Sequence, residues 1–167
     1  MTIVFLILVG IPLIRAQQQS DCTCCSQEYR SFDFWIGEWE VTLPDGSPAG
    51  VNLIERIQDG CVLQEQWKSA RQGFTGTSFT YFNRRLGQWE QLWVDNSGNI
   101  LKLKGGLKGD AMVLSSEPAL DPEGVPVINR ITWSLQEDGR VRQHWEVLRD
   151  GAVHQVLFDG YYRKTGE

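Results

Sequence analysis

Apolar and polar residues alternate along most of the chain from residue 38 to residue 164, the pattern typical of half-buried β-strands. The alternating segments are short and are separated by turn-forming pairs such as Asp59-Gly60, Asp138-Gly139 and Asp150-Gly151. Connections this short join antiparallel neighbours, because a parallel crossover needs about a dozen residues. The pattern predicts ten strands, over residues 38–43, 51–58, 61–68, 73–83, 88–95, 98–105, 109–116, 128–136, 140–149 and 152–164.

The arrangement of these strands follows from their edges. A row of ten antiparallel strands leaves two unpaired edges unless its first and last strands meet, and closure into a barrel removes both edges. We therefore predict an all-β fold, an antiparallel up-and-down β-barrel of about ten strands. Two flat sheets packed as a sandwich, with polar residues at the rim, are the alternative. Residues 117–127, which include three prolines, are expected to form a loop.

An aromatic stretch directly precedes the first strand. Residues 32–36 contain Phe32, Phe34 and Trp35, and Gly37 follows at the point where the strand pattern begins. Glycine tolerates backbone conformations that other residues avoid, so it suits a sharp change of direction. We expect this stretch to form a short N-terminal helical plug that closes one end of the barrel.

Several strand faces combine tryptophans with polar residues. Polar groups inside a barrel cost free energy unless they find partners, either in a closed hydrogen-bond network or in a cavity that holds water and a ligand. Aromatic walls with a few polar groups are typical of small-molecule pockets. The alternative is a barrel core filled by side chains, with no room for a ligand. The predicted ligand-binding residues are Glu65, Trp67, Gln91, Trp93, Trp133, Gln143 and Trp145.

The motif Gly37-x-Trp39, with Arg163 near the end of the last strand, resembles the signature of the calycin superfamily, which includes lipocalins and fatty-acid-binding proteins. The resemblance implies that Trp39 closes the barrel base and that Arg163 packs across its ring. Longer segments such as F-D-F-W-I-G-E-W-E-V and F-D-G-Y-Y-R resemble a family of exported bacterial proteins within that superfamily. This family has no established reaction, so the resemblance implies a fold and a location.

The first residues have the features of an export signal. Residues 2–14 form an apolar run that is shorter than the roughly 20 residues a membrane-spanning helix needs. Ala16 ends this region and three glutamines follow, as expected for a cleavage site. We predict a signal peptide over residues 1–16, a cysteine-containing segment over 17–30 and the barrel over 31–167, with export to the periplasm or the medium. An uncleaved N-terminal anchor is the alternative.

Four cysteines fit an oxidising location. In an exported chain we expect a disulfide between Cys61 and one of Cys22, Cys24 and Cys25, and spacing does not say which. A second bridge within the cluster would be strained by the short spacing. Zinc at these cysteines and haem on a histidine are weaker alternatives, because the two histidines, His144 and His154, lack the spacing of metal ligands. We expect neither a metal nor another cofactor.

Charge narrows the range of partners. The formal net charge is −5, which argues against nucleic-acid binding because phosphate backbones are bound by basic surfaces. No basic run suggests attachment to an anionic membrane, and no membrane span is expected after signal removal. We therefore expect a protein that binds a small, partly apolar molecule. The alternatives are an isomerase or hydrolase that uses a carboxylate such as Glu65, Asp95 or Glu146, and a filled barrel that serves as an interaction module in the cell envelope.

Overall fold

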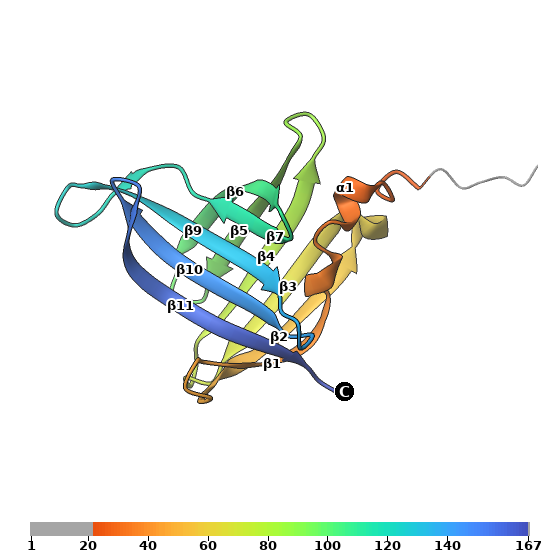
Figure 1. Ribbon diagram of the computed structural model, residues 1–167, viewed down its shortest axis with the longest axis horizontal. Coiled ribbons are helices and arrows are strands. Elements are labelled where there is room, and N and C mark those ends of the chain that lie inside the picture. The colour runs from red at the N-terminus through yellow and green to blue at the C-terminus, as the bar shows by residue number, and fades with distance from the viewer. Residues whose placement is uncertain (1–21, 167) are drawn as a thin grey trace, which may run out of the picture.

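Ten strands form a closed antiparallel barrel in the computed structural model, which describes residues 22–166 (Figure 1). Most strands pair with their neighbours in sequence, β7 pairs directly with β9, and pairing of β1 with β11 closes the ring. The predicted fold class is therefore confirmed. The barrel strands are β1 (Gly37–Thr42), β2 (Pro48–Ile57), β3 (Val62–Ser69), β4 (Thr75–Asn83), β5 (Gln88–Asp95), β6 (Ile100–Lys108), β7 (Ala111–Ser115), β9 (Pro126–Leu135), β10 (Val141–Arg149) and β11 (Ala152–Lys164).

The expected loop over residues 117–127 contains a short extra strand. Residues Ala119–Leu120 form β8, which pairs with the first residues of β9. The side chain of Asp121 accepts hydrogen bonds from the backbone N–H groups of Glu123 and Val125, which holds the turn. Arg149 at the end of β10 pairs with Asp121, so this hairpin is tied to the neighbouring strand and projects beyond it (Figure 1).

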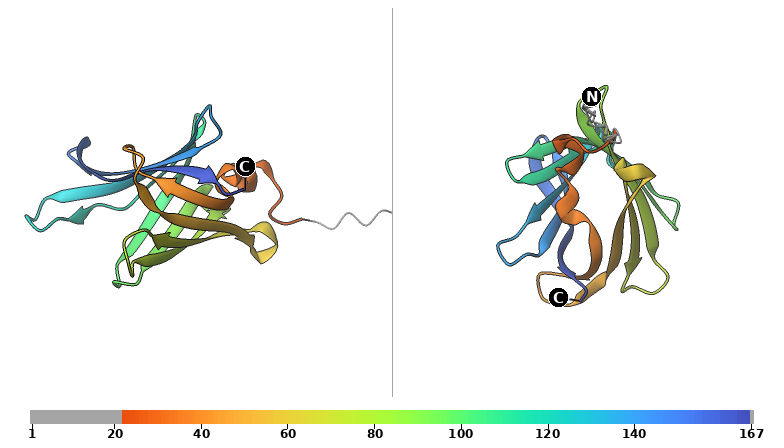
Figure 2. Two further views of the ribbon diagram at one scale, coloured as in Figure 1. Left: turned by 90° about the horizontal axis from the view of Figure 1, so that it is seen from below. Right: turned by 90° about the vertical axis from the view of Figure 1, so that its right-hand side faces the viewer.

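A helical segment closes one end of the barrel, as the aromatic stretch predicts. The helix α1 (Gln27–Arg30) and the 3-10 turn η1 (Asp33–Trp35) lie across this end (Figure 2). Phe32 and Trp35 are fully buried, and their rings stack with centroids 5.0 Å apart. The ring of Phe32 also contacts Trp89 and Trp133 edge-on. We call this group of four rings the plug cluster.

The first strand begins at Gly37, whose φ of +145° lies in a region that favours glycine. Trp39 is buried, and its indole N–H donates a hydrogen bond to the carbonyl of Trp35, 2.9 Å away. The expected contact between Trp39 and Arg163 is wrong. Strand pairing places Lys164 opposite Trp39, and the Lys164 ammonium lies 5.5 Å from the ring centroid. Arg163 lies on the outer face, where it pairs with Glu40 at 2.6 Å.

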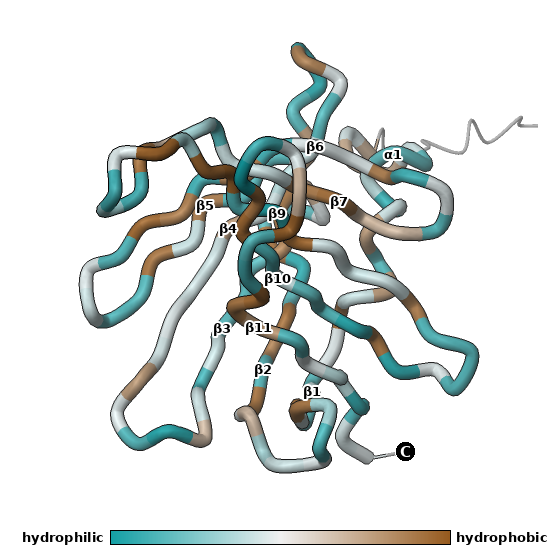
Figure 3. The backbone as a smooth tube through the Cα atoms, turned by 60° about the vertical axis from the view of Figure 1, so that its left-hand side comes forward, coloured by the Kyte–Doolittle hydropathy of each residue, from teal (hydrophilic) through white to brown (hydrophobic). Residues whose placement is uncertain are grey.

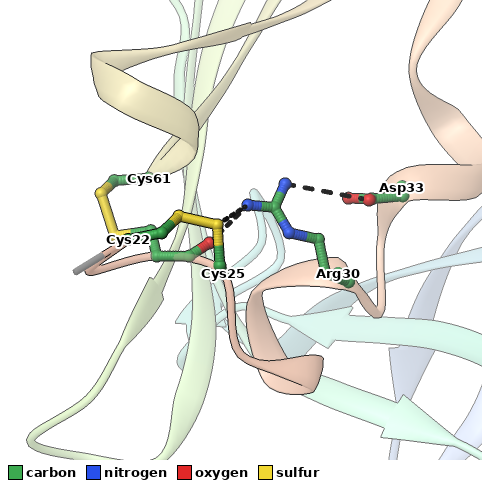
Figure 4. Close-up of a disulfide and its surroundings, with 6 residues drawn as sticks. Cys22, Cys25, Arg30, Asp33 and Cys61 are labelled. Atoms are coloured by element: carbon green, nitrogen blue, oxygen red, sulfur yellow. Dashed lines mark hydrogen bonds and ion pairs between the residues drawn. A yellow bond between two sulfur atoms is a disulfide. The ribbon is translucent and has the colours of Figure 1, made fainter. Parts of the chain in front are cut away.

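The N-terminal segment contains one disulfide and is linked to the barrel by a second (Figure 4). Cys61, which follows the short 3-10 turn η2 (Gln58–Gly60), pairs with Cys24, and this bond fastens the plug to the barrel. Cys22 also pairs with Cys25, so a second bridge lies within the cluster. The guanidinium of Arg30 donates hydrogen bonds to the carbonyl of Cys24 at 2.6 Å and to the sulfur of Cys25 at 3.4 Å.

The other end of the barrel is open. The strand β11 pairs with β1 only through residues 161–164, and its first half, over residues 152–157, is exposed beyond the end of β1. Figure 3 turns this end toward the viewer and shows polar hairpin loops around strands that carry apolar residues. The predicted signal peptide, residues 1–16, lies outside the described residues. No helix formed by residues 22–166 is long and apolar enough to cross a membrane.

Candidate functional site

A cavity of about 520 Å³ lies inside the barrel between the plug cluster and the open end. Inward-facing side chains of β3, β5, β10 and β11 form most of its wall, and the loops after β1 and β3 lie at its mouth with the last residue of β5. Three tryptophan and two phenylalanine rings line it: Trp67, Phe74, Trp93, Trp145 and Phe158. Four polar side chains lie deeper among them: Glu65, Gln91, Gln143 and Tyr162.

Glycines on neighbouring strands leave room for two of the tryptophan rings. A Cβ atom at Gly76 would lie 2.1 Å from the ring of Trp93, and one at Gly50 would lie 2.7 Å from the ring of Trp67. No real side chain fits at such distances, so the rings can lie against the sheet only because these two residues are glycines. The cavity therefore stays open although two large rings line it.

Glu65 is the buried acidic residue of this cavity, with 5% of its surface exposed. Its two carboxyl oxygens accept hydrogen bonds from the side-chain amide of Asn52 and from the hydroxyl of Ser78, each at 2.7 Å. The three residues come from β2, β3 and β4, which are adjacent in the sheet and present them on the inner face. The carboxyl group is thus fixed in place by neutral donors.

Burial raises the pKa of the Glu65 carboxyl, and the hydrogen bonds from Asn52 and Ser78 oppose this shift. The nearby hydroxyl of Tyr162 has a pKa well above 10, chiefly because of burial and also because of the charge of Glu65. Both shifts have the same physical origin, since each ionised form would be poorly solvated in this part of the barrel. The cavity therefore favours the neutral forms of both groups when no charged partner is present.

Two glutamine side chains present hydrogen-bonding groups to the cavity. Gln143 accepts a hydrogen bond from the hydroxyl of Tyr162, and the amide of Gln91 donates to the hydroxyl of Thr80 at 2.9 Å. Among residues 22–166, no group bonds the remaining amide nitrogen of Gln143 or the remaining amide oxygen of Gln91. One donor and one acceptor are therefore available to a bound molecule.

The mouth of the cavity carries two charged side chains. Asp95 lines the mouth and also holds the turn after β5, because its carboxylate accepts hydrogen bonds from Ser97 and Asn99. The hydrogen bond from the Asn99 amide is the main reason that the pKa of Asp95 is lowered. Arg71, on the loop between β3 and β4, is exposed and is the cationic residue of the lining. The mouth thus carries one acidic and one basic side chain, whereas the floor carries the acidic Glu65 without a basic partner.

Most of the predicted ligand-binding residues meet at this cavity. Six of the seven line it, and together they come from β3, β5 and β10. Trp133 does not, and the expectation that it lines the cavity is wrong: it is fully buried in the plug cluster, 5.2 Å from Phe32 and 5.4 Å from Trp35 between ring centroids. Alternation along β9 gives the correct face for Trp133 but no information on its depth along the barrel axis.

Sequence reasoning missed three residues around Glu65: Asn52 and Ser78, which donate hydrogen bonds to its carboxyl group, and Tyr162, which lines the cavity beside it. Each has a signal in the sequence. Asn52 shares an inner face with Ile54, Ser78 shares one with Thr80, and Tyr162 shares a parity with the buried Gly160. A period-two reading of β2, β4 and β11 would have placed all three inside the barrel.

Of the three acids considered for catalysis, Glu65 and Asp95 line the cavity, at its floor and at its mouth, and Glu146 does not. Glu146 lies on the outer face, where the guanidinium of Arg130 donates hydrogen bonds to it at 2.8 and 3.0 Å. The side chain of His144 lies beside it, with 3.7 Å between the two closest atoms. Only Glu65 of the three reaches the floor of the cavity. Within residues 22–166, no cluster of three or more histidine, cysteine or acidic side chains could hold a metal ion.

Comparison with protein families and with curated proteins finds no relative of this chain: no protein-family model matches it, and no curated protein does. The fold therefore rests on the architecture itself, a closed antiparallel ten-strand barrel with a short N-terminal helix, which is consistent with a calycin-like fold.

Proposed function

We propose that this chain is an exported barrel of the calycin type that binds a small, partly apolar molecule in its interior. The observation that carries the proposal is the cavity of about 520 Å³, open at one end and lined by rings and a few polar groups. Pockets for small molecules commonly range from about 300 to 1,000 Å³. A filled barrel acting as an interaction module would not need such a space.

The positions of two glycines support the proposal that the barrel keeps its interior open for a ligand. Gly76 allows the ring of Trp93 to lie against the wall, and an ordinary side chain there would push that ring inward. An added Cβ at Gly50 would meet the ring of Trp67 and, closer still, the backbone carbonyl oxygen of Lys68 at 2.4 Å. A barrel that gained nothing from an open interior would be more stable with the space filled, because empty apolar volume costs free energy. Ligand binding gives a reason to keep it open.

Export is supported by two features at the N-terminal end of the chain. Disulfides persist in oxidising compartments, and the cysteines of residues 22–61 are joined in two pairs. The apolar run over residues 2–14 and the small residue Ala16 fit a cleaved signal peptide. Membership of the calycin superfamily is supported by the barrel architecture together with Gly37 and the buried Trp39 at the start of β1.

Tryptophan fluorescence tests the proposal, because three of the seven tryptophans line the cavity. The mature protein is titrated with a library of metabolites and lipids, and thermal unfolding is followed in parallel. We expect at least one compound to change the emission saturably and to raise the melting temperature, as a ligand of the folded state must. If no compound produces either effect, the proposal is wrong.

Two variants identify where the signal arises. Trp93→Phe removes an indole from the cavity, so we expect it to reduce the ligand-dependent change in emission. Trp89→Phe is the matched control on the same strand, because Trp89 belongs to the plug cluster and its indole N–H donates to Ser31. An equal loss of signal in both variants would place the ligand elsewhere.

A second candidate function is proton transfer catalysed by Glu65. It is favoured by the raised pKa of this carboxyl group in a ring-lined cavity beside Tyr162, an environment that suits a general acid or base. Any ligand found in the screen can be incubated with the protein in heavy water and examined by NMR. Deuterium incorporation or turnover that Glu65→Gln abolishes would support catalysis, and their absence in the wild-type protein would reject it.

A further inference from the structure

The floor of the cavity has an acidic residue and no basic one. At the floor, Glu65 is the ionisable group aimed into the space together with the phenol of Tyr162, and none of the lining residues there is a lysine, an arginine or a histidine. The cationic side chain of the lining, Arg71, is exposed at the mouth. A ligand with a carboxylate at its inner end would meet a carboxyl group without a compensating cation, which is unfavourable in a poorly solvated site.

The side chains at the floor have unused hydrogen-bond acceptors that a donor group of a ligand could occupy. Each oxygen of Glu65 accepts one hydrogen bond from the protein, and a carboxylate oxygen can accept a second. The free amide oxygen of Gln91 is a further acceptor in the same lining. An ammonium group has three donors and no acceptor, so it matches this set.

The walls around the floor suit the same group. Trp67, Trp93 and Trp145 line the cavity from β3, β5 and β10, and indole rings attract cations through their faces. The rest of the wall is apolar and fits a hydrocarbon or aryl body. An amine with an apolar body therefore has partners for both of its ends.

From these observations, and on the basis of the binding function proposed above, we propose that the cavity takes a small amphipathic amine. Its ammonium group lies at the floor on Glu65 and Gln91, its apolar body lies between the tryptophan rings, and any anionic substituent points to the mouth near Arg71. The ion pair with a buried carboxylate would make the head group, rather than the body, the main determinant of selectivity.

Ammonium binding is coupled to the ionisation of Glu65. Burial raises the pKa of this carboxyl, so binding of a cation favours loss of its proton to solvent. The groups that face it are neutral: Asn52 from β2, Ser78 from β4 and Tyr162 from β11, whose own pKa is raised. Affinity for an amine should therefore rise with pH until Glu65 is ionised in the free protein, and affinity for an alcohol should not.

Three probes with one body test the proposal by isothermal titration calorimetry: phenylbutylamine, phenylbutanol and phenylbutyrate. For the wild-type protein we expect the amine to bind about tenfold or more tightly than the alcohol, and the acid to bind most weakly, because hydrogen bonds to charged groups are stronger than neutral ones. Glu65→Gln should bring the amine to within about twofold of the alcohol. Glu55→Gln, the same change at an exposed carboxylate on the outer face of β2, is the control and should keep the preference.

The outcomes separate this inference from the binding function itself. If the acid binds as tightly as the amine, or if Glu65→Gln keeps the preference for the amine, the inference is wrong while the cavity still binds ligands. If none of the probes binds the wild-type protein, the inference is wrong, and the library screen alone decides the binding function. If Glu65→Gln fails to fold, calorimetric titrations of the wild-type protein in buffers of different ionisation heats test the inference instead. The inference requires that amine binding releases protons and that alcohol binding does not.

Discussion

At the scale of single residues, the inner face of this barrel combines groups that have opposite effects on stability. A carboxyl group held between Asn52 and Ser78 is costly to ionise, and a protein selected for stability alone would have an apolar side chain there. The rings of Trp67 and Trp93 stabilise the barrel by covering the sheet, yet they leave space beyond them. This combination is expected where a binding site is maintained at some expense of stability.

The ionisation of Glu65 predicts a pH dependence of folding. The carboxyl pKa is raised above its ordinary value of 4.5 in the folded protein, so the folded state keeps a proton that the unfolded chain has released. Stability contributed by this group is therefore lost as pH rises from 4.5 through the raised value. We expect Glu65→Gln to gain free energy of unfolding relative to wild type at pH 8 and to lose that advantage at pH 4. Urea unfolding at both values measures it.

The matched control for this change is Glu55→Gln, since Glu55 lies exposed on the outer face of β2. It should leave the pH dependence of the free energy of unfolding unchanged. An identical pH dependence in wild type and Glu65→Gln would contradict the burial argument.

The close packing of glycine against tryptophan predicts the effect of one added methyl group. In Gly76→Ala the new Cβ would lie 2.1 to 2.9 Å from ring atoms of Trp93, so the ring must move into the cavity. We expect a loss of about 1–3 kcal/mol in the free energy of unfolding, as for other overpacked sites. Gly106→Ala is the control, because nothing lies within 4 Å of its added Cβ. Equal stability of the two variants in urea unfolding would show that the ring has room to shift.

At the scale of elements, the plug is the part that makes one end of the barrel different from the other. Its sequence could be read in advance, because three aromatic residues and an isoleucine precede Gly37 and have no strand alternation. The partners of Arg163 and Trp39 could not be predicted from the sequence, because a shift of one residue in the pairing of β1 with β11 moves every side chain to the other face. The choice of Cys24 as the partner of Cys61 likewise depends on the path of the chain around α1.

The plug cluster predicts a large effect of a single truncation. Phe32 is fully buried and its ring contacts Trp35, Trp89 and Trp133, so Phe32→Ala should cost about 3–5 kcal/mol of unfolding free energy. Phe79→Ala, on the outer face and 40% exposed, should cost at most about 1 kcal/mol. Chemical denaturation compares the two. Similar losses would mean that the plug does not hold the barrel together.

The two disulfides should differ in their contribution to stability. Cys24 and Cys61 are separated by 37 residues, and closing a loop of this size stabilises by about 4 kcal/mol in the chain-entropy model. Cys22 and Cys25 are separated by 3, for which the same model gives about 1.5–2 kcal/mol. Replacing both cysteines of each pair by serine, followed by denaturation without reductant, should show the larger loss for the first pair. The reverse order would contradict the assignment of Cys24–Cys61 as the bond that holds the plug.

At the scale of the whole molecule, the closed barrel was predictable and the shape of its interior was not. Alternation and short turns determine ten antiparallel strands, and the need to pair the outer edges determines closure. Alternation also placed Glu65, Gln91 and Gln143 on inner faces, because it depends only on strand geometry. The depth of Trp133 in the plug and the space left beside Trp93 depend on packing between distant strands, which no local pattern encodes.

We have proposed that the open interior binds a small, partly apolar molecule, and titration calorimetry with the tightest-binding compound of the library screen tests this without assuming a charged head group. We expect saturable binding of one molecule to the wild-type protein and to Gly106→Ala. We expect about tenfold weaker binding to Gly76→Ala, in which the ring of Trp93 is pushed into the cavity. Binding that is equal in Gly76→Ala and wild type, or the absence of saturable binding to all three proteins, would contradict it.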